Sequence, residues 1–102
     1  MLRGYDIDGT LTTGLRPVKP YVVISGRTIA EYDETVKKLA NEAPVYIRCT
    51  GKVGDRIAAG NFKAEVIKLL DVKEFYEDDE VQAQIIRDRC PEVVVKMAPS
   101  FS

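Results

Sequence analysis

The stretch Tyr5-Asp6-Ile7-Asp8-Gly9-Thr10-Leu11-Thr12 decides how the rest of this chain is interpreted. It places two carboxylates, Asp6 and Asp8, at the end of an apolar segment. Side chains at positions i and i+2 of a strand point to the same side, so both acids are expected to face one ligand where the chain leaves a sheet. Gly9 permits a sharp turn there, because it has no Cβ. Two close carboxylates repel each other, and hard oxygen ligands of this kind suit Mg²⁺.

This arrangement of acids favours chemistry at phosphorus. An aspartate carboxylate can accept a phosphoryl group and form an acyl phosphate, which water then hydrolyses. A second carboxyl group can protonate the leaving oxygen and later deprotonate the water. The plainer alternatives are a simple turn or an adventitious calcium loop. An EF-hand loop needs further acids, and Thr10-Leu11-Thr12 does not supply them.

Length and composition describe an ordinary globular domain. The 102 residues predict one domain spanning 1–102, and a net charge of −1 excludes the basic footprint of a dedicated nucleic-acid binder. A nucleotide or a nucleic-acid end stays open as a substrate. With two cysteines and no histidine, a zinc site and histidine-based catalysis are not expected. No targeting segment precedes Asp6 and no apolar run approaches the roughly 20 residues that span a membrane, so we expect a cytoplasmic protein without a membrane partner.

Apolar runs and helical periodicities alternate along the chain. Strands are predicted at the N-terminus up to Tyr5 and at residues 21–24, 45–49, 75–76 and 93–97; helices are predicted at 28–42, at 57–70 with a break near Gly60-Asn61, and at 81–90. This alternation predicts an α/β fold with a mainly parallel five-stranded sheet. Ligands of such sheets bind beyond the carboxyl ends of the strands, where Asp6, Ser25 and the acids 77–79 are expected.

The segment Asp6–Thr12 resembles the first motif of the haloacid dehalogenase superfamily, whose members are mostly Mg²⁺-dependent phosphohydrolases. The resemblance implies a three-layer α/β/α sandwich, a Rossmannoid fold with strand order 5-4-1-2-3, in which the first and fourth strands are neighbours. Larger members insert a cap domain after this motif. Residues 7–24 leave no room for one, so the site is expected to be open to bulky substrates or closed by a neighbouring subunit.

Three later segments resemble the remaining motifs of the family. Ser25-Gly26 resembles the second motif, Lys63 the third, and Glu77-Asp78-Asp79 the fourth. Each has a plainer alternative: a turn before a helix capped by Thr28, a surface lysine, and a solvated acidic run in which Asp79 caps a helix. Lys52, Lys68 and Lys73 compete with Lys63, which is preferred because an apolar turn follows it.

The resemblance assigns a role to each of these residues. Asp6 is the nucleophile, and Asp8 is the general acid and base. Ser25, the Gly26 N–H and Lys63 hold the phosphoryl oxygens. Asp6, Asp8 (also through its carbonyl) and Asp78 hold Mg²⁺, while the choice between Asp78 and Asp79 stays open. Arg27 is either a substrate contact or an exposed arginine.

The predicted function is therefore a phosphatase of nucleotidase type that hydrolyses a phosphomonoester on a small molecule or on a macromolecular end. Two alternatives stay open. One is a catalytically weak interaction protein that keeps the fold and the metal site. The other is a receiver-type phospho-acceptor, which would need an aspartate at the end of the third strand, where Cys49-Thr50 stands. A homo-oligomer is also left open.

Overall fold

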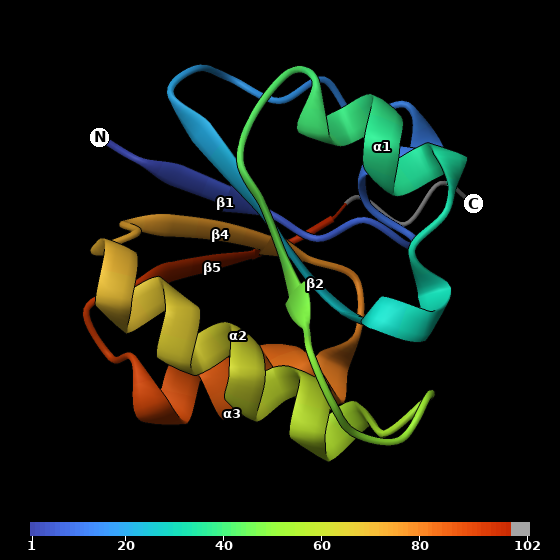
Figure 1. Ribbon diagram of the computed structural model, residues 1–102. Helices are drawn as coiled ribbons and strands as arrows, with labels where there is room; N and C mark the ends of the chain where they lie inside the picture. The colour runs from blue at the N-terminus through green and yellow to red at the C-terminus, as the bar shows by residue number, and fades with distance from the viewer. Residues whose placement is uncertain (99–102) are drawn as a thin grey trace.

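The computed structural model describes residues 1–98 as an α/β fold built on five strands and three α-helices (Figure 1). The strands are β1 (Arg3–Tyr5), β2 (Tyr21–Thr28), β3 (Val45–Arg48), β4 (Glu74–Glu77) and β5 (Val94–Met97). The α-helices are α1 (Glu34–Ala40), α2 (Arg56–Leu70) and α3 (Glu80–Arg89), and two 3-10 turns, η1 (Leu11–Thr13) and η2 (Ile29–Glu31), lie beside β1 and β2 in sequence. The predicted α/β class is confirmed.

All pairs of neighbouring strands are parallel, and their order across the sheet is β3-β2-β1-β4-β5. Listed from the opposite edge, the same sheet is β5-β4-β1-β2-β3. The predicted contact between the first and fourth strands is confirmed, because Tyr5 is in register with Tyr76 of β4. Tyr5 is also in register with Val23 of β2. The residues that follow Tyr5 therefore leave the sheet between the carboxyl ends of β2 and β4.

The side chains of β2 alternate between two apolar clusters, one on each face of the sheet. Val22 and Ile24 pack in a cluster with α2 and α3, whereas Tyr21 and Val23 pack in a cluster with Val36 of α1. Figure 1 shows α2 and α3 together below the sheet and α1 on the other side of it. A strand that is buried on both faces is an unbroken apolar run in sequence, as residues 21–24 are.

The first helix begins later than predicted. The chain stays extended as β2 through Thr28, passes through η2, and enters α1 at Glu34. The Asp33 carboxylate caps α1 by accepting hydrogen bonds from the Thr35 and Val36 N–H groups. The predicted helix over 28–42 is therefore wrong at its start, because the Thr28–Glu31 pair, a pattern typical of helix N-termini, closes only a single 3-10 turn here.

The second helix is continuous through Gly60-Asn61, so the predicted break is also wrong. Gly60 lies against α3, where a Cβ would stand 2.9 Å from Cδ1 of Ile85. The glycine therefore serves close packing of two helices and not a change of direction. None of the described helices is both long and apolar enough to cross a bilayer.

Candidate active site at the carboxyl ends of the strands

Lys63 forms the buried centre of the candidate site. It reaches from the middle of α2 to the carboxyl ends of β1 and β4, and its Nζ donates to Asp6 Oδ1 at 3.0 Å and to Glu77 Oε1 at 2.6 Å. Lys63 and Glu77 are fully buried, and Asp6 is 5% exposed. Burial raises the pKa of Asp6 well above its usual range, against the opposing effect of Lys63. Burial alone would lower the pKa of Lys63, but the charges of Asp6 and Glu77 raise it overall.

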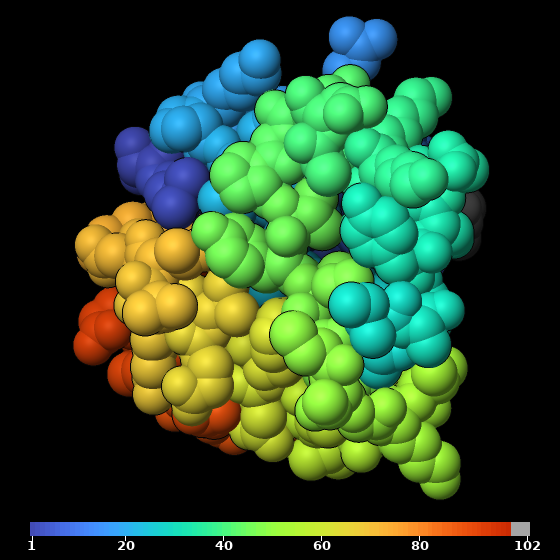
Figure 2. Space-filling view, in the orientation of Figure 1, coloured from blue at the N-terminus to red at the C-terminus, as the bar shows by residue number. Residues whose placement is uncertain are grey.

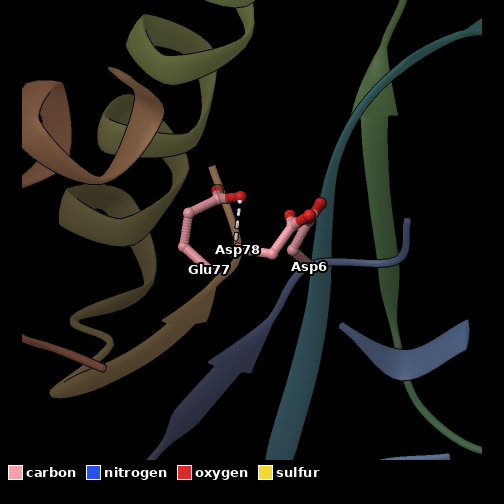
Figure 3. Close-up of side chains that lie close together, drawn as sticks. All are labelled: Asp6, Glu77 and Asp78. Carbon is pink, nitrogen blue, oxygen red and sulfur yellow. Dashed lines mark hydrogen bonds between the residues drawn. The ribbon is translucent and has the colours of Figure 1, made fainter. Parts of the chain in front are cut away.

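A second carboxylate, that of Asp78, lies close to Asp6. Figure 3 shows the carboxylates of Asp6 and Asp78 close together, with the Glu77 carboxylate beside them and bonded to the backbone of Asp78. One carboxylate oxygen from each of Asp6, Glu77 and Asp78 lies within 4.8 Å of the other two, close enough to hold one metal ion. Their oxygens are the ligand type that Mg²⁺ prefers.

Both carboxylate oxygens of Glu77 already have partners, which separates this residue from the other two acids. Oε1 accepts from Lys63, and Oε2 accepts from the backbone N–H groups of Asp78 and Asp79. Glu77 therefore holds Lys63 and the backbone of the acidic segment in place. Asp6 and Asp78 are the side chains with oxygens available to a cation.

The predicted metal ligand Asp8 lies away from this cluster. Its side chain is 62% exposed and is bound on both oxygens by Arg27, at 2.9 Å from Nε and 2.8 Å from Nη2. Arg27 also donates to Asp33 at 2.9 Å. These hydrogen bonds from Arg27 hold the pKa of Asp8 below its usual range. In this conformation Asp8 is an ionised carboxylate, whereas a general acid near neutral pH needs a raised pKa.

Asp79 is separated from the cation cluster by its own interactions. Its carboxylate caps α3 by accepting from the Val81 N–H, and it is bound by Arg56 and by Gln82 Nε2. These hydrogen bonds, with that of Arg56 foremost, lower the pKa of Asp79 to about 2. The adjacent acids thus have different positions: Asp78 faces Asp6, and Asp79 holds the start of α3.

Ser25 and Gly26 form the wall of the site beside Lys63. Ser25 is buried, and its Oγ accepts a hydrogen bond from the Arg27 N–H at 3.1 Å. Gly26 lies against α2, where a Cβ would stand 2.5 Å from Cβ of Ala59. No α-helix begins at Thr28 behind this wall, because the chain is still β2 there and α1 starts at Glu34. The helix termini near this wall are those of α2 and α3.

These groups open into one pocket of about 260 Å³. It contains every predicted site residue (Asp6, Asp8, Ser25, Gly26, Lys63 and Asp78), together with Asp79 and Gln82 and three arginines, Arg27, Arg48 and Arg56. Glu31 of η2 and Gly54 before α2 also line it, and Figure 2 shows these two segments, in cyan and yellow-green, side by side at the surface. The predicted convergence of chain segments that are distant in sequence is confirmed.

Sequence reasoning assigned no separate role to Glu77 and did not single out Arg48. Glu77 was grouped with its acidic neighbours, but the alternation of a strand would have indicated that it points inward with Phe75. Arg48 ends β3 and is 5% exposed, although a charged residue at a strand end reads as a surface residue.

Comparison of the chain with protein-family models, with curated proteins and with solved structures gave no match.

Proposed function

We propose that this chain is a Mg²⁺-dependent phosphohydrolase that acts on a phosphomonoester through an aspartyl phosphate, in the manner of the haloacid dehalogenase superfamily. The observation that carries the proposal is the buried contact of Lys63 with Asp6, beside Asp78 and in one pocket with Ser25. Lys63 contacts the carboxylate of Asp6, which lies close to that of Asp78. A positive charge held in this position can stabilise the negative charge of a phosphoryl group during its transfer.

The proposal extends to the fold. We propose the capless three-layer α/β/α sandwich of that superfamily, with the Rossmannoid strand order 5-4-1-2-3. What supports it is the placement of α1 on one face and of α2 and α3 on the other, together with β1 at the centre of the sheet.

In the proposed reaction, an Asp6 oxygen attacks phosphorus while the bond to the leaving oxygen breaks. Lys63, Ser25 Oγ and the Gly26 N–H hold the phosphoryl oxygens. Mg²⁺, held by Asp6 and Asp78 and by the carbonyl of Asp8, would supply charge neutralisation to the carboxylates and the phosphoryl group. Water then attacks phosphorus, gives up its proton to Asp8, and inorganic phosphate leaves as Asp6 is regenerated.

Asp8 must exchange partners to act in this way. As general acid it protonates the leaving oxygen, which requires it to leave Arg27 and to gain a proton. The Asp8 side chain is 62% exposed, so it can rotate away from Arg27 into solvent. The present pairing supports a second candidate, a catalytically weak binding protein that keeps the cation site and leaves Asp8 bound to Arg27.

Hydrolysis of an aryl phosphate tests the proposal. We expect phosphate release that depends on Mg²⁺, stops with chelator, and is abolished in Asp6→Asn. Asp88→Asn is the matched control, since Asp88 is exposed on α3 and does not line the pocket. Full activity in Asp6→Asn would remove Asp6 as nucleophile, and binding of Mg²⁺ without any turnover would favour the second candidate.

A further inference from the structure

The three arginines of the pocket differ in how their charges are balanced. Arg27 is paired with Asp8 and Asp33, and Arg56 is paired with Asp79. Arg48 makes its hydrogen bonds to backbone carbonyls alone: Nε donates to Gly26 O at 2.8 Å and Nη2 donates to Lys52 O at 2.9 Å. Within residues 1–98 no carboxylate lies within ion-pair distance of it.

Arg48 is the most buried of the three, which makes its missing counter-ion unusual. Arg48 is 5% exposed. Charged groups buried in proteins are ordinarily paired, because desolvation of an isolated charge is strongly unfavourable. The third nitrogen, Nη1, donates to no atom of the described chain and is not fully enclosed. Nη1 lies beside Gly51, where a Cβ would stand 2.7 Å from it, and the Arg48 side chain lines the pocket that an anion would enter.

The surroundings of Arg48 also favour an anion. Its Nε is fixed on Gly26, the residue after Ser25, so the guanidinium lies beside the proposed phosphoryl site. The start of α2, residues 54–56, lines the same pocket, where the Asp55 carboxylate caps the helix by accepting from the Ala58 N–H and the backbone N–H groups of the first turn add their dipole. A planar guanidinium suits recognition of phosphate oxygens.

We propose that Arg48 binds a second phosphate group of the substrate, so that the pocket is specific for phosphomonoesters that carry another phosphate close to the one removed. This assignment rests on the proposed function for the first phosphate, held at Ser25, Gly26 and Lys63. Arg48 binds the neighbouring phosphate through Nη1, and the α2 N-terminus adds its dipole. Substrates with one phosphate leave the charge of Arg48 without a partner.

The competing role for Arg48 is purely structural, because its two hydrogen bonds tie the segment before α2 to β2. Binding of two probes separates the roles. Isothermal titration with inorganic phosphate and with methylenediphosphonate, at constant free Mg²⁺, compares one phosphate-like group with two. The variants are Arg48→Gln and, as the matched control, Arg16→Gln, which removes the same charge from an exposed arginine outside the pocket.

We expect the native protein to bind methylenediphosphonate about tenfold more tightly than phosphate, since each charge-assisted contact of this kind contributes on that order. Arg48→Gln should lose this preference while its affinity for phosphate changes less than about threefold, and Arg16→Gln should behave as the native protein. Equal weakening for both probes in a folded Arg48→Gln protein would assign Arg48 a structural role and overturn the proposal. A native protein without preference would overturn it as well.

Arg48→Lys keeps the test decisive where circular dichroism shows that Arg48→Gln does not fold. Lysine retains the charge and loses the guanidinium with its backbone contacts, so a reduced but measurable preference for methylenediphosphonate supports the proposal, and equal affinity for both probes overturns it. None of these readouts needs turnover. If the protein hydrolyses no phosphate ester but still prefers methylenediphosphonate through Arg48, the proposed phosphohydrolase activity is refuted and the second anion site is supported.

Discussion

Lys63 Nζ lies 3.0 Å from Asp6 Oδ1, although the two residues are 57 positions apart in the sequence. The contact joins α2 to the end of β1 through the interior, and Glu77 completes it from β4. One positive charge thus faces two carboxyl groups from two other segments, all three out of water. An arrangement of this kind fixes the positions of the elements relative to the pocket. Removal of any one partner is expected to destabilise the fold strongly.

Lys63→Met is expected to lower the free energy of unfolding by about 3 kcal/mol, because Asp6 and Glu77 would remain buried without their cation. Urea unfolding measures this loss. Lys68→Met is the control, because Lys68 lies exposed on the same helix and its replacement should change stability by less than about 0.5 kcal/mol. Combining Lys63→Met with Glu77→Gln should recover part of the loss. A double variant less stable than Lys63→Met would contradict the view that unpaired charge is the cause.

Gly9→Ala should disrupt the cation site through a direct clash. A Cβ on Gly9 would stand 1.9 Å from Asp78 Oδ2, and the φ of this residue is +77°. Gly14 has a similar φ of +93° with nothing within 4 Å of the corresponding Cβ. Gly14→Ala therefore shows the cost of backbone strain alone, of order 1 kcal/mol. We expect Gly9→Ala to lose Mg²⁺ affinity in titration calorimetry, and Gly14→Ala to keep it. Equal Mg²⁺ affinity in the two variants would show that Asp78 does not bind the cation.

Asp78 and Asp79 are adjacent, but their replacement should have opposite consequences. Asp78→Asn removes an oxygen ligand that faces Asp6, so Mg²⁺ affinity should fall at least about tenfold with little loss of stability. Asp79→Ala removes the cap of α3 and the partner of Arg56, so stability should fall by about 1 kcal/mol while Mg²⁺ affinity is largely kept. Mg²⁺ titration and thermal unfolding of both variants measure the contrast. The reverse pattern would identify Asp79, and not Asp78, as the ligand of the cation.

Much of this fold could be predicted because the signals are local. The run Tyr21 to Ile24 is apolar on both faces, and the spacing of Val66, Ile67 and Leu70 repeats at the helical period. The extension of β2 to Thr28 could not be predicted, because it depends on pairing with Arg48 across the sheet. The role of Gly60 likewise depends on Ile85, which is remote in sequence.

The same limit applies to the site. The convergence of Asp6, Ser25 and Asp78 follows from the rule that ligands bind at the carboxyl ends of parallel strands. The pairing of Asp8 with Arg27 does not follow from any pattern, since it depends on the side-chain direction of a residue beyond the end of β1 and on the extension of β2 through Arg27. The partners of buried charged groups are a property of the assembled chain: Glu77 meets Lys63 from another element, and Arg48 meets the carbonyls of Gly26 and Lys52.

Tyr76 gives the fold a measurable dependence on alkaline pH. Its hydroxyl donates to Glu74 Oε1 at 2.5 Å, and this hydrogen bond, with burial, raises the pKa of Tyr76 to about 12. Because the folded pKa lies above the unfolded value of about 10, the stabilisation is complete below pH 10 and is lost as the pH rises from about 10 to about 12. Tyr76→Phe keeps the ring stacked on Tyr5, at 4.6 Å between centroids, and removes the hydroxyl.

Ultraviolet titration of tyrosinate should therefore show a late component in the native protein that disappears in Tyr76→Phe. Tyr32→Phe is the control, because Tyr32 is 48% exposed and its loss should leave the late component unchanged. Urea unfolding between neutral pH and pH 11 should show a smaller alkaline loss of stability in Tyr76→Phe than in the native protein. If all tyrosines of the folded native protein titrate together near pH 10, the Tyr76–Glu74 hydrogen bond does not form in solution.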